Sequence, residues 1–423
     1  MNRKVQLGDL CDFINGGAWS DKEYVTTGIP VLKVSNFKPS GFLLEDVSRL
    51  PNSSLEKYKK HLLQKGDMVI ATVGSHPNLV NSAAGRSCVI TDEVTGYLLN
   101  QNAVCVRTLD SEVLDQKYLT YLGKSFYFQH YIQSRGKGAA NQMRIAISAI
   151  KEYELEPPDI GTQRRIAEIL SAYDDLIENN QKQIKLLEEA AMRLYKEWFV
   201  NLRFPGYENS KIVDGVPEGW NRITVAEALQ MYIGGGWGKE SPAGKYVYKG
   251  RVIRGTDINN IKNGDFLSVP VRYHSENDMK KRKLQSNDIV FEMSNGNIDN
   301  IGRCLFIDEL VLSSCGDNTI CASFCKLLRP KDLKTAIVLY HEINDMQLSG
   351  RMSSLKKNGA NGINNFDFDG FLSHEFLLPD NNALTIYLHD IMLKISNIQK
   401  QFLVLRSARD KLLPKLMSGE IEV

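Results

Sequence analysis

Two long stretches of the chain place apolar residues alternately four and three residues apart, which is a repeat of seven. The first stretch is interrupted only by Asn180 and the second only by Arg409. Such a narrow stripe is typical of the seam of a coiled coil, whereas a helix on a globular core shows a broader apolar face. The seam positions are Ile166, Leu170, Tyr173, Ile177, Asn180, Ile184, Leu187, Ala191, Leu194 and Trp198, followed in the second stretch by Leu384, Leu388, Ile391, Ile395, Ile398, Phe402, Leu405, Arg409, Leu412 and Leu416.

We therefore predict one long helix within residues 158–200 and another within residues 381–423, and we expect them to pair with each other. Pairing buries both seams without an outside partner, and an antiparallel orientation fits because a long folded region separates the two stretches. Asn180 would fix the register of the pair at some cost in stability. Two independent surface helices are the alternative.

The segments before the two helices alternate short β-rich runs with turns rich in Gly, Asn and Ser. Runs such as residues 68–73 and 103–106 predict strands, and apolar spacing predicts helices over residues 113–133 and 333–347. Gly and Pro residues within 201–220 end the first long helix and predict a linker. The fold class that follows is α+β: two mixed α/β domains joined by two long helices that form an antiparallel coiled coil, with a pseudo-two-fold internal repeat.

The repeat is visible in the sequence itself. One shift of register aligns residues 59–69 with residues 280–290, and other matches follow in the same order along both halves. A series of matches in one order indicates a duplicated domain, and its length is far above the 20–50 residues of a solenoid repeat. The later matches pair Gly85-Arg86 with Gly302-Arg303, residues 138–141 with 358–361, and Pro158-Asp159 with Pro379-Asp380.

Composition narrows the class of protein. Of 423 residues, 43% are hydrophobic and 24% are charged, which is typical of folded domains and not of a disordered chain. No apolar run is long enough for a membrane span, and we expect no signal peptide. Because the seven cysteines are scattered, we expect reduced thiols and a cytoplasmic location. The net charge is only +2, so a surface for nucleic acid would have to be local.

Sequence patterns for catalysis are weak. The glycine-rich run at residues 234–238 precedes Lys239 but lacks the first glycine and the final Ser or Thr of a phosphate-binding loop. The prolines at 157–158 are followed by an aspartate, not by the aromatic residue that would stack a flipped base. We therefore expect a binding role. The cysteines nearest one another lack the spacing of a metal site, and buried thiols account for them: Cys315, Cys321 and Cys325.

Several blocks carry a family resemblance. Residues 157–180 resemble the central conserved helix of the specificity subunits of type I restriction-modification systems. Residues 194–206 and 216–220 are similar to the segment that follows that helix, and residues 412–421 are similar to the ending of the family. One departure is the second helix, where residues 381–384 lack the Gln-Arg-Arg-Ile-Ala that begins at Gln163.

The resemblance implies a subunit without catalytic activity. In that family, two target recognition domains each read one half of a split double-stranded DNA sequence, and the paired helices set the gap between the halves. Two copies of a methyltransferase subunit dock on it, and restriction subunits join them, so S-adenosylmethionine, ATP and magnesium are expected on the partners only. No membrane partner is implied. The domains would be 1–157 and 221–380 for recognition, 158–200 and 381–423 for the helices, and 201–220 for the linker.

Three loops that recur in both halves are the candidates for DNA contact. Such loops combine glycines, which allow close backbone approach, with Lys and Arg for phosphates and with Asn, Gln, Ser and Thr for base edges. The candidates in the first half are Gly16, Gly17, Ser20, Thr72, Ser75, His76, Asn78, Asn81, Arg135, Lys137, Asn141, Gln142 and Arg144. Those in the second half are Lys239, Ser294, Asn295, Asn297, Lys356, Lys357, Asn358 and Asn361.

Two other functions stay open at this point. The chain could be a coiled-coil structural adaptor with no role on DNA, or a fused methyltransferase or nuclease whose catalytic centre the sequence does not reveal. Binding of duplex DNA separates the first from a specificity subunit. Methylation or cleavage by the purified chain alone identifies the second.

Overall fold

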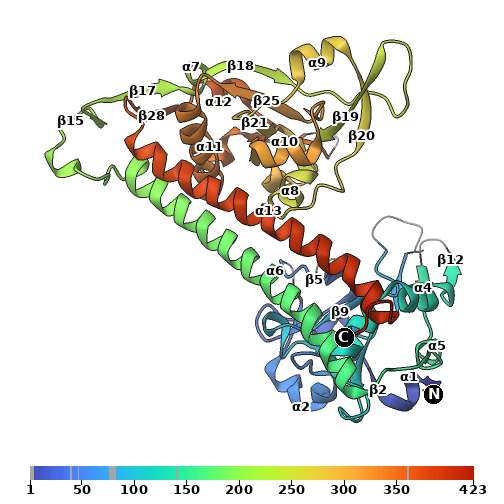
Figure 1. Ribbon diagram of the computed structural model, residues 1–423. Helices are drawn as coiled ribbons and strands as arrows, with labels where there is room; N and C mark the ends of the chain where they lie inside the picture. Colours follow the sequence, from blue (N-terminus) through green and yellow to red (C-terminus); the bar gives the residue numbers. More distant parts are fainter. Residues whose placement is uncertain (1–3, 39–40, 46, 76–81, 140–141, 360–361) are drawn as a thin grey trace. The chain divides into compact units, whose positions relative to one another are not determined.

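A computed structural model describes residues 4–38, 41–45, 47–75, 82–139, 142–359 and 362–423 (Figure 1). The chain forms two compact units, Met1–Asp175 with Arg406–Val423 (unit 1) and Leu176–Leu405 (unit 2). Both boundaries fall inside long helices, because each unit packs one part of each helix against its own domain. Among the described residues, no helix has the length and hydropathy needed to cross a membrane.

Unit 1 is built on a four-stranded antiparallel sheet in the order β2 (Cys11–Asn15), β11 (Ala103–Thr108), β7 (Met68–Ala71) and β9 (Ser87–Val89). Alternate residues of β7 and β11 enter two different cores, as the period of two in a strand requires. One core lies under α3 (Gln116–Lys124) and α4 (Phe126–Ser134).

The helix predicted over residues 113–133 is in fact two helices. Ser125 has extended backbone angles (φ −65°, ψ 145°), ends α3 and begins α4. Its hydroxyl accepts a hydrogen bond from the amide of Phe128, which satisfies one of the free N–H groups at the start of α4. A local cap thus overrides a continuous apolar pattern.

Four small sheets complete the described part of unit 1. β3 (Ile29–Leu32) lies between β10 (Leu98–Leu99) and β6 (Arg49–Leu50). Short strands also pair as β1 (Val5–Gln6) with β14 (Glu154–Leu155) and β4 (Phe37–Lys38) with β5 (Gly41–Phe42). The fourth small sheet, at the loops, is described with the candidate interface. The short helices are α1 (Leu7–Leu10), α2 (Leu55–Tyr58) and α5 (Ile147–Lys151).

Unit 2 repeats the central sheet of unit 1. Its strands lie in the order β18 (Leu229–Gly234), β25 (Cys325–Pro330), β21 (Ile289–Glu292) and β23 (Cys304–Phe306), all antiparallel. The predicted helix over 333–347 is α11 (Leu333–Leu348). The same strand order on two segments confirms the duplication that the sequence matches indicate.

The remaining elements of unit 2 surround this sheet. β19 (Tyr246–Ile253) pairs with β20 (Val271–Ser275) and with β24 (Ile320–Cys321), and β17 (Trp220–Thr224) pairs with β28 (Glu375–Pro379). The linker region contains a small hairpin of β15 (Ile212–Val213) and β16 (Val216–Pro217). The other helices are α7 (Val225–Ala228), α8 (Ile258–Lys262), α9 (Glu276–Arg282), α10 (Glu309–Cys315) and α12 (Phe368–Leu372).

The two predicted long helices are α6 (Ile160–Tyr195), which continues as a π-helix over Lys196–Val200, and α13 (Ala383–Met417). Within unit 1, the start of α6 meets the end of α13: Leu170 and Leu416 share one buried cluster. Within unit 2, the end of α6 meets the start of α13, with the rings of Trp198 and Tyr387 5.5 Å apart. Both contacts have the antiparallel sense.

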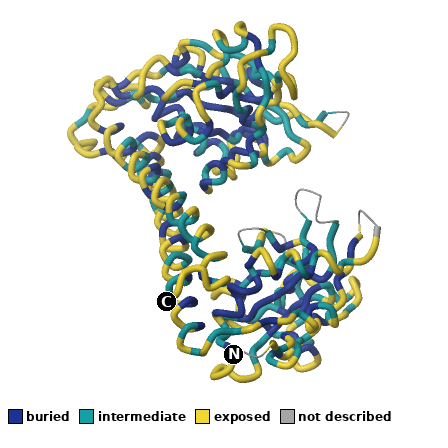
Figure 2. Tube along the Cα trace, turned by 45° about the vertical axis from the view of Figure 1, so that its right-hand side comes forward, coloured by how far each residue is buried: buried dark blue, intermediate teal, exposed yellow. Residues whose placement is uncertain are grey.

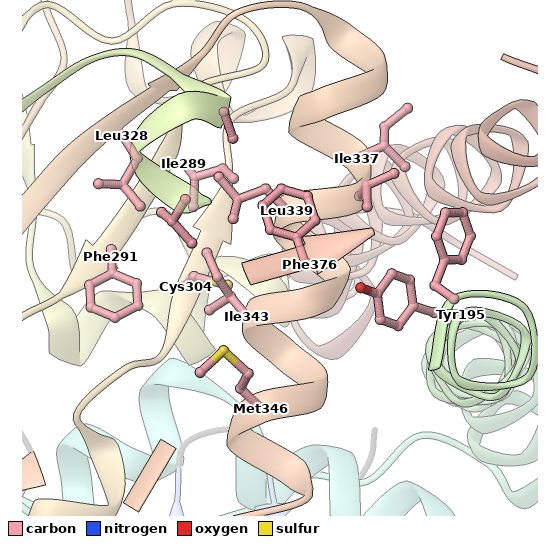
Figure 3. Close-up of a cluster of buried hydrophobic side chains, with 14 of the residues drawn as sticks. Tyr195, Ile289, Phe291, Cys304, Leu328, Ile337, Leu339, Ile343, Met346 and Phe376 are labelled. Carbon is pink, nitrogen blue, oxygen red and sulfur yellow. The ribbon is translucent and has the colours of Figure 1, made fainter. Parts of the chain in front are cut away.

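Buried and half-buried residues recur among exposed ones along both long helices (Figure 2), and the seam positions are among the buried and half-buried residues. The first seam position of each helix is buried, Ile166 in α6 and Leu384 in α13. The seam residues Asn180 and Phe402 are buried as well. The others are buried or half-buried. Figure 3 shows how Tyr195 of α6 enters the main core of unit 2, beside Phe376 and the α11 side chain Ile337.

Candidate nucleic-acid interface

In unit 1 the three candidate loops leave the domain at one edge of its central sheet. β2 ends at Asn15 opposite Val104, and β7 ends at Ala71 opposite Ala103, so both strands end where β11 begins. Because β2 and β7 flank β11 and run the same way, the loops that follow them start side by side. Both loops form hydrogen bonds to the same turn at the start of β11. The amide of Gly16 donates to the carbonyl oxygen of Ala103, and the amide of Thr72 donates to that of Asn102.

The third loop of unit 1 joins the second through a small sheet. The hairpin of β12 (Lys137–Ala139) and β13 (Gln142–Arg144) pairs with β8 (Val73–Gly74), which follows β7 directly. We call this meeting point of the three loops the recognition edge of unit 1.

Unit 2 has a recognition edge of the same construction. β18 ends at Gly234 opposite Lys326, and β21 ends at Glu292 opposite Cys325, so both end where β25 begins. The following loop joins a sheet of β22 (Ser294–Asn295), β27 (Asn364–Phe366) and β26 (Lys356–Lys357). The sequence showed that the loops recur, and the sheet order explains why they converge.

The candidate residues differ in their exposure. Gly16, Gly17 and Thr72 are buried, whereas Ser75, Ser294, Asn295 and Lys356 are half-buried. His76, Asn78, Asn81, Asn141 and Asn361 lie outside the described residues. The exposed candidates are Ser20, Arg135, Lys137, Gln142 and Arg144 in unit 1 and Lys239, Asn297, Lys357 and Asn358 in unit 2.

The two glycines of the first loop have an internal reason to be glycine. A Cβ on Gly16 would lie 1.9 Å from the carbonyl oxygen of Asn100, and a Cβ on Gly17 would lie 2.2 Å from the ring of Trp19. These contacts are far too short for any side chain. The glycines therefore let the loop pack closely on its own domain, and their contact with DNA stays a prediction.

Several polar candidates shape the loops through hydrogen bonds. Ser20 caps the short helix that follows it, accepting from the amide of Lys22. The Ser294 hydroxyl is 2.7 Å from Oδ1 of Asn365, and Asn295 donates to the buried carboxylate of Glu292 at 2.7 Å. These side chains hold the backbone of the loops in place, and the Asn295 side-chain oxygen also accepts from the amide of Asn297 at 2.8 Å.

The basic candidates supply the local positive charge. Within the described residues, Lys137, Arg144 and Lys239 form no ion pair, whereas Lys357 lies 2.9 Å from Asp367. Arg135 stacks on the ring of Tyr131, with its guanidinium carbon 3.5 Å from the ring centroid. Unpaired cations beside a polar loop are what phosphate binding requires.

Two arginines from the repeated Gly-Arg pairs are turned inward. Arg86 donates to the carbonyl oxygens of Phe37 and Ser82, both at 2.8 Å, and Arg303 lies 2.8 Å from the carboxylate of Glu292. Both are half-buried, so their repetition reflects the architecture of the loops. Trp237, in the loop that follows β18, and Arg272, on β20, contact each other, and neither was among the residues that the sequence indicated. A tryptophan in a glycine-rich loop was the available signal.

In the described part of the chain, no group of three or more His, Cys, Asp or Glu residues is placed to hold a metal ion. The cysteines, Cys315, Cys321 and Cys325 among them, are buried and form no disulfide. Burial raises the pKa of the Cys321 thiol to about 12.

The sequence of the chain is similar to those of several known proteins. Residues 2–189 match the family model of the type I restriction modification DNA specificity domain. The chain is 25% identical over 318 residues to the type I restriction enzyme MjaIX specificity subunit of Methanocaldococcus jannaschii, an alignment that covers 73% of this chain and 69% of the relative. The putative MjaX specificity subunit of the same organism is 23% identical over 59% of this chain and 57% of its own.

A solved structure shares the fold. The crystal structure of the type I restriction-modification S subunit from M. genitalium superposes with a TM-score of 0.55 at 16% identity, covering 98% of this chain and 95% of that one. The duplicated sheets, the two long helices and these matches agree with one another. Residues 2–189 thus match the type I restriction modification DNA specificity domain, and the chain is similar in sequence to type I restriction enzyme specificity subunits.

Proposed function

We propose that this chain is the non-catalytic DNA-specificity subunit of a type I restriction-modification complex, in which each recognition edge reads one half of a bipartite target. The observation that carries the proposal is the recurrence of one sheet and one three-loop edge in two units whose loop side chains differ. Phosphate contacts by the exposed Lys and Arg residues would position each unit, and polar side chains of the loops would read base edges.

Two long helices continuous with both units favour a second role, that of a spacer between the two half-sites. A helix rises 1.5 Å per residue, so its length converts directly into a separation along DNA. The duplication also favours two equivalent docking places, one for each of two copies of a methyltransferase subunit. Restriction subunits would join this assembly, and S-adenosylmethionine, ATP and magnesium would bind to the partners.

Methylome sequencing tests the proposal. Cells with the methyltransferase partner are compared with and without this chain, and a bipartite methylated motif is expected only when the chain is present. Exchange of residues 72–144 for the same segment of a related subunit should change one half of that motif. A change in both halves would contradict separate reading by the two units.

Purification addresses the alternatives. The chain should co-purify with about two methyltransferase subunits and shift a duplex that carries the motif. A coiled-coil adaptor would bind its partners without any effect on DNA binding. Methylation or cleavage by the isolated chain would instead reveal an enzyme.

A further inference from the structure

Trp237 lies in the first candidate loop of unit 2, three residues after β18 ends, and covers a cation. The indole is 40% exposed, and the guanidinium carbon of Arg272 on β20 lies 4.7 Å from its ring centroid. The Arg272 side chain is only 19% exposed. An aromatic face over a guanidinium holds that cation in one position by cation–π attraction. A fixed cation thus lies directly beneath an exposed aromatic ring.

The tryptophan in the matching loop of unit 1 is arranged differently. Trp19 donates from Nε1 to the hydroxyl of Tyr24 at 2.9 Å, and its ring meets that of Tyr58 edge-on at 5.2 Å. It packs beside the small core of that unit. The pairing of an exposed tryptophan with an arginine is therefore a feature of unit 2.

The ionic partner of Arg272 is weakly held. Its Nη2 lies 3.3 Å from Oε1 of Glu240, whose side chain is 85% exposed. An ion pair to such an exposed carboxylate contributes little stability. Nη1 donates to the carbonyl of Val271 at 3.1 Å, and Nε is buried without a hydrogen-bond partner among the described residues. The guanidinium can therefore exchange Glu240 for a stronger anion.

The surroundings favour an anion with further polar contacts. Lys239 and Lys245 are exposed, and their ammonium groups lie 5.1 and 5.8 Å from the ring centroid of Tyr246. Beneath the loop, His274 is fully buried, and neither ring nitrogen has a hydrogen-bond partner among the described residues. A Cβ on Gly238 would lie 2.8 Å from that ring, so the loop rests directly on it.

We propose that Arg272, held by Trp237, is a binding site for a backbone phosphate of duplex DNA in unit 2, and that Glu240 occupies the guanidinium until the phosphate replaces it. This inference rests on the proposed function, because it assigns one contact of the half-site that unit 2 reads. A phosphate forms charge-assisted hydrogen bonds with a guanidinium in a planar, two-point geometry that a flexible exposed carboxylate does not maintain. The site positions unit 2 on the duplex and leaves base reading to the other loops.

The test measures DNA affinity by fluorescence anisotropy over a series of salt concentrations. The full chain with its methyltransferase partner is titrated onto a labelled duplex that carries the motif found by methylome sequencing. Arg272→Gln should weaken binding about tenfold and reduce the salt slope by about 1, the value for one lost phosphate contact. Glu240→Gln should strengthen binding severalfold, because it frees the guanidinium.

A second ion pair in unit 2 offers matched controls. Arg222 on β17 lies 3.8 Å from Glu375 on β28, away from the recognition edge, and both side chains are exposed. Arg222→Gln and Glu375→Gln repeat the same changes of charge and should leave affinity within about twofold. If Arg272→Gln binds like Arg222→Gln, or if Glu240→Gln binds no tighter than Glu375→Gln, the inference is overturned while the proposed function stands. A wild-type complex that fails to bind the motif would instead refute the proposed function.

Discussion

The guanidinium of Arg409 on α13 and the carboxylate of Asp174 on α6 meet at 2.6 Å in unit 1. Arg409 is the one polar residue in the seam of the second helix, where an unpaired charge would be costly. Asp174 also accepts hydrogen bonds from the hydroxyl of Tyr121 at 2.8 Å and from Lys124 at 3.3 Å. One carboxylate therefore ties both long helices to helix α3 of the recognition domain.

Replacing Asp174 should destabilise unit 1 in a pH-dependent way. Burial opposes the charge, but Lys124 and Arg409 outweigh it and hold the pKa of Asp174 below its ordinary value. A lowered native pKa stabilises the fold above the unfolded value of about 3.9, and this contribution is lost as the pH falls through the native value. Asp174→Asn should cost about 1–3 kcal/mol at neutral pH.

The measurement is the melting temperature of both proteins between pH 3 and pH 7. The difference between wild type and Asp174→Asn should be largest above about pH 5 and should shrink below about pH 4. Asp175→Asn changes the neighbouring, exposed carboxylate and serves as the control. A constant difference across the range would contradict the role of this charge.

In unit 2, α6 is attached to its domain by a tyrosine on α6 and a carboxylate on the domain. In unit 1 the carboxylate is on α6 and the tyrosine is on the domain. The Tyr195 hydroxyl donates to Glu342 on α11 at 2.7 Å, and Glu342 also accepts from Arg351 at 2.9 Å. Tyr195→Phe should cost about 1–3 kcal/mol of unfolding free energy, because the buried carboxylate loses a donor. Tyr387→Phe removes an exposed hydroxyl and should cost less than about 0.5 kcal/mol in the same denaturant titration.

Asn180 should fix the register of the two long helices at a cost in their stability. Its side chain is buried in the seam, and Nδ2 has no hydrogen-bond partner among the described residues. Asn180→Leu should therefore raise the melting temperature, by an amount equivalent to about 1–2 kcal/mol. Asn179→Leu, at an exposed position, should change it little. Equal effects from both variants would show that the seam amide carries no cost.

Lengthening both long helices should lengthen the gap in the DNA target. Seven residues inserted beside Asn180, with a matching seven in α13, preserve the seam and add about 10 Å at 1.5 Å per residue. At 3.4 Å per base pair this corresponds to about three base pairs in the methylated motif. Seven residues inserted at Ser210, in the linker, should leave the gap unchanged. An unchanged gap in both variants would refute the spacer role.

The thiols should be unreactive in the folded chain. All seven cysteines are buried, and burial raises the pKa of Cys11 to about 12 and that of Cys304 to about 11. The thiolate is the reactive form, so Ellman's reagent should react slowly at pH 8 and should detect all seven thiols after denaturation. A rapid reaction of the native chain would indicate that a buried cysteine becomes accessible.

The structural features that arise from local periodicity could be predicted from the sequence. The repeat of seven predicts α6 and α13, and the shifted matches predict two copies of one domain, because both signals lie in consecutive residues. The family resemblance also depends on contiguous blocks. Where a local detail competed with the pattern, as at Ser125, the expected single helix was wrong.

The sequence by itself therefore determined the duplicated domains, the two long helices and the kinds of side chain in the recurring loops. Only the tertiary structure decided which of those side chains meet. Strand order brings residues from three distant loops to one edge, packing turns Trp19 inward and leaves Trp237 exposed over Arg272, and Asp174 neutralises a seam arginine far along the chain. These relationships depend on contacts between residues remote in sequence, which no local pattern encodes.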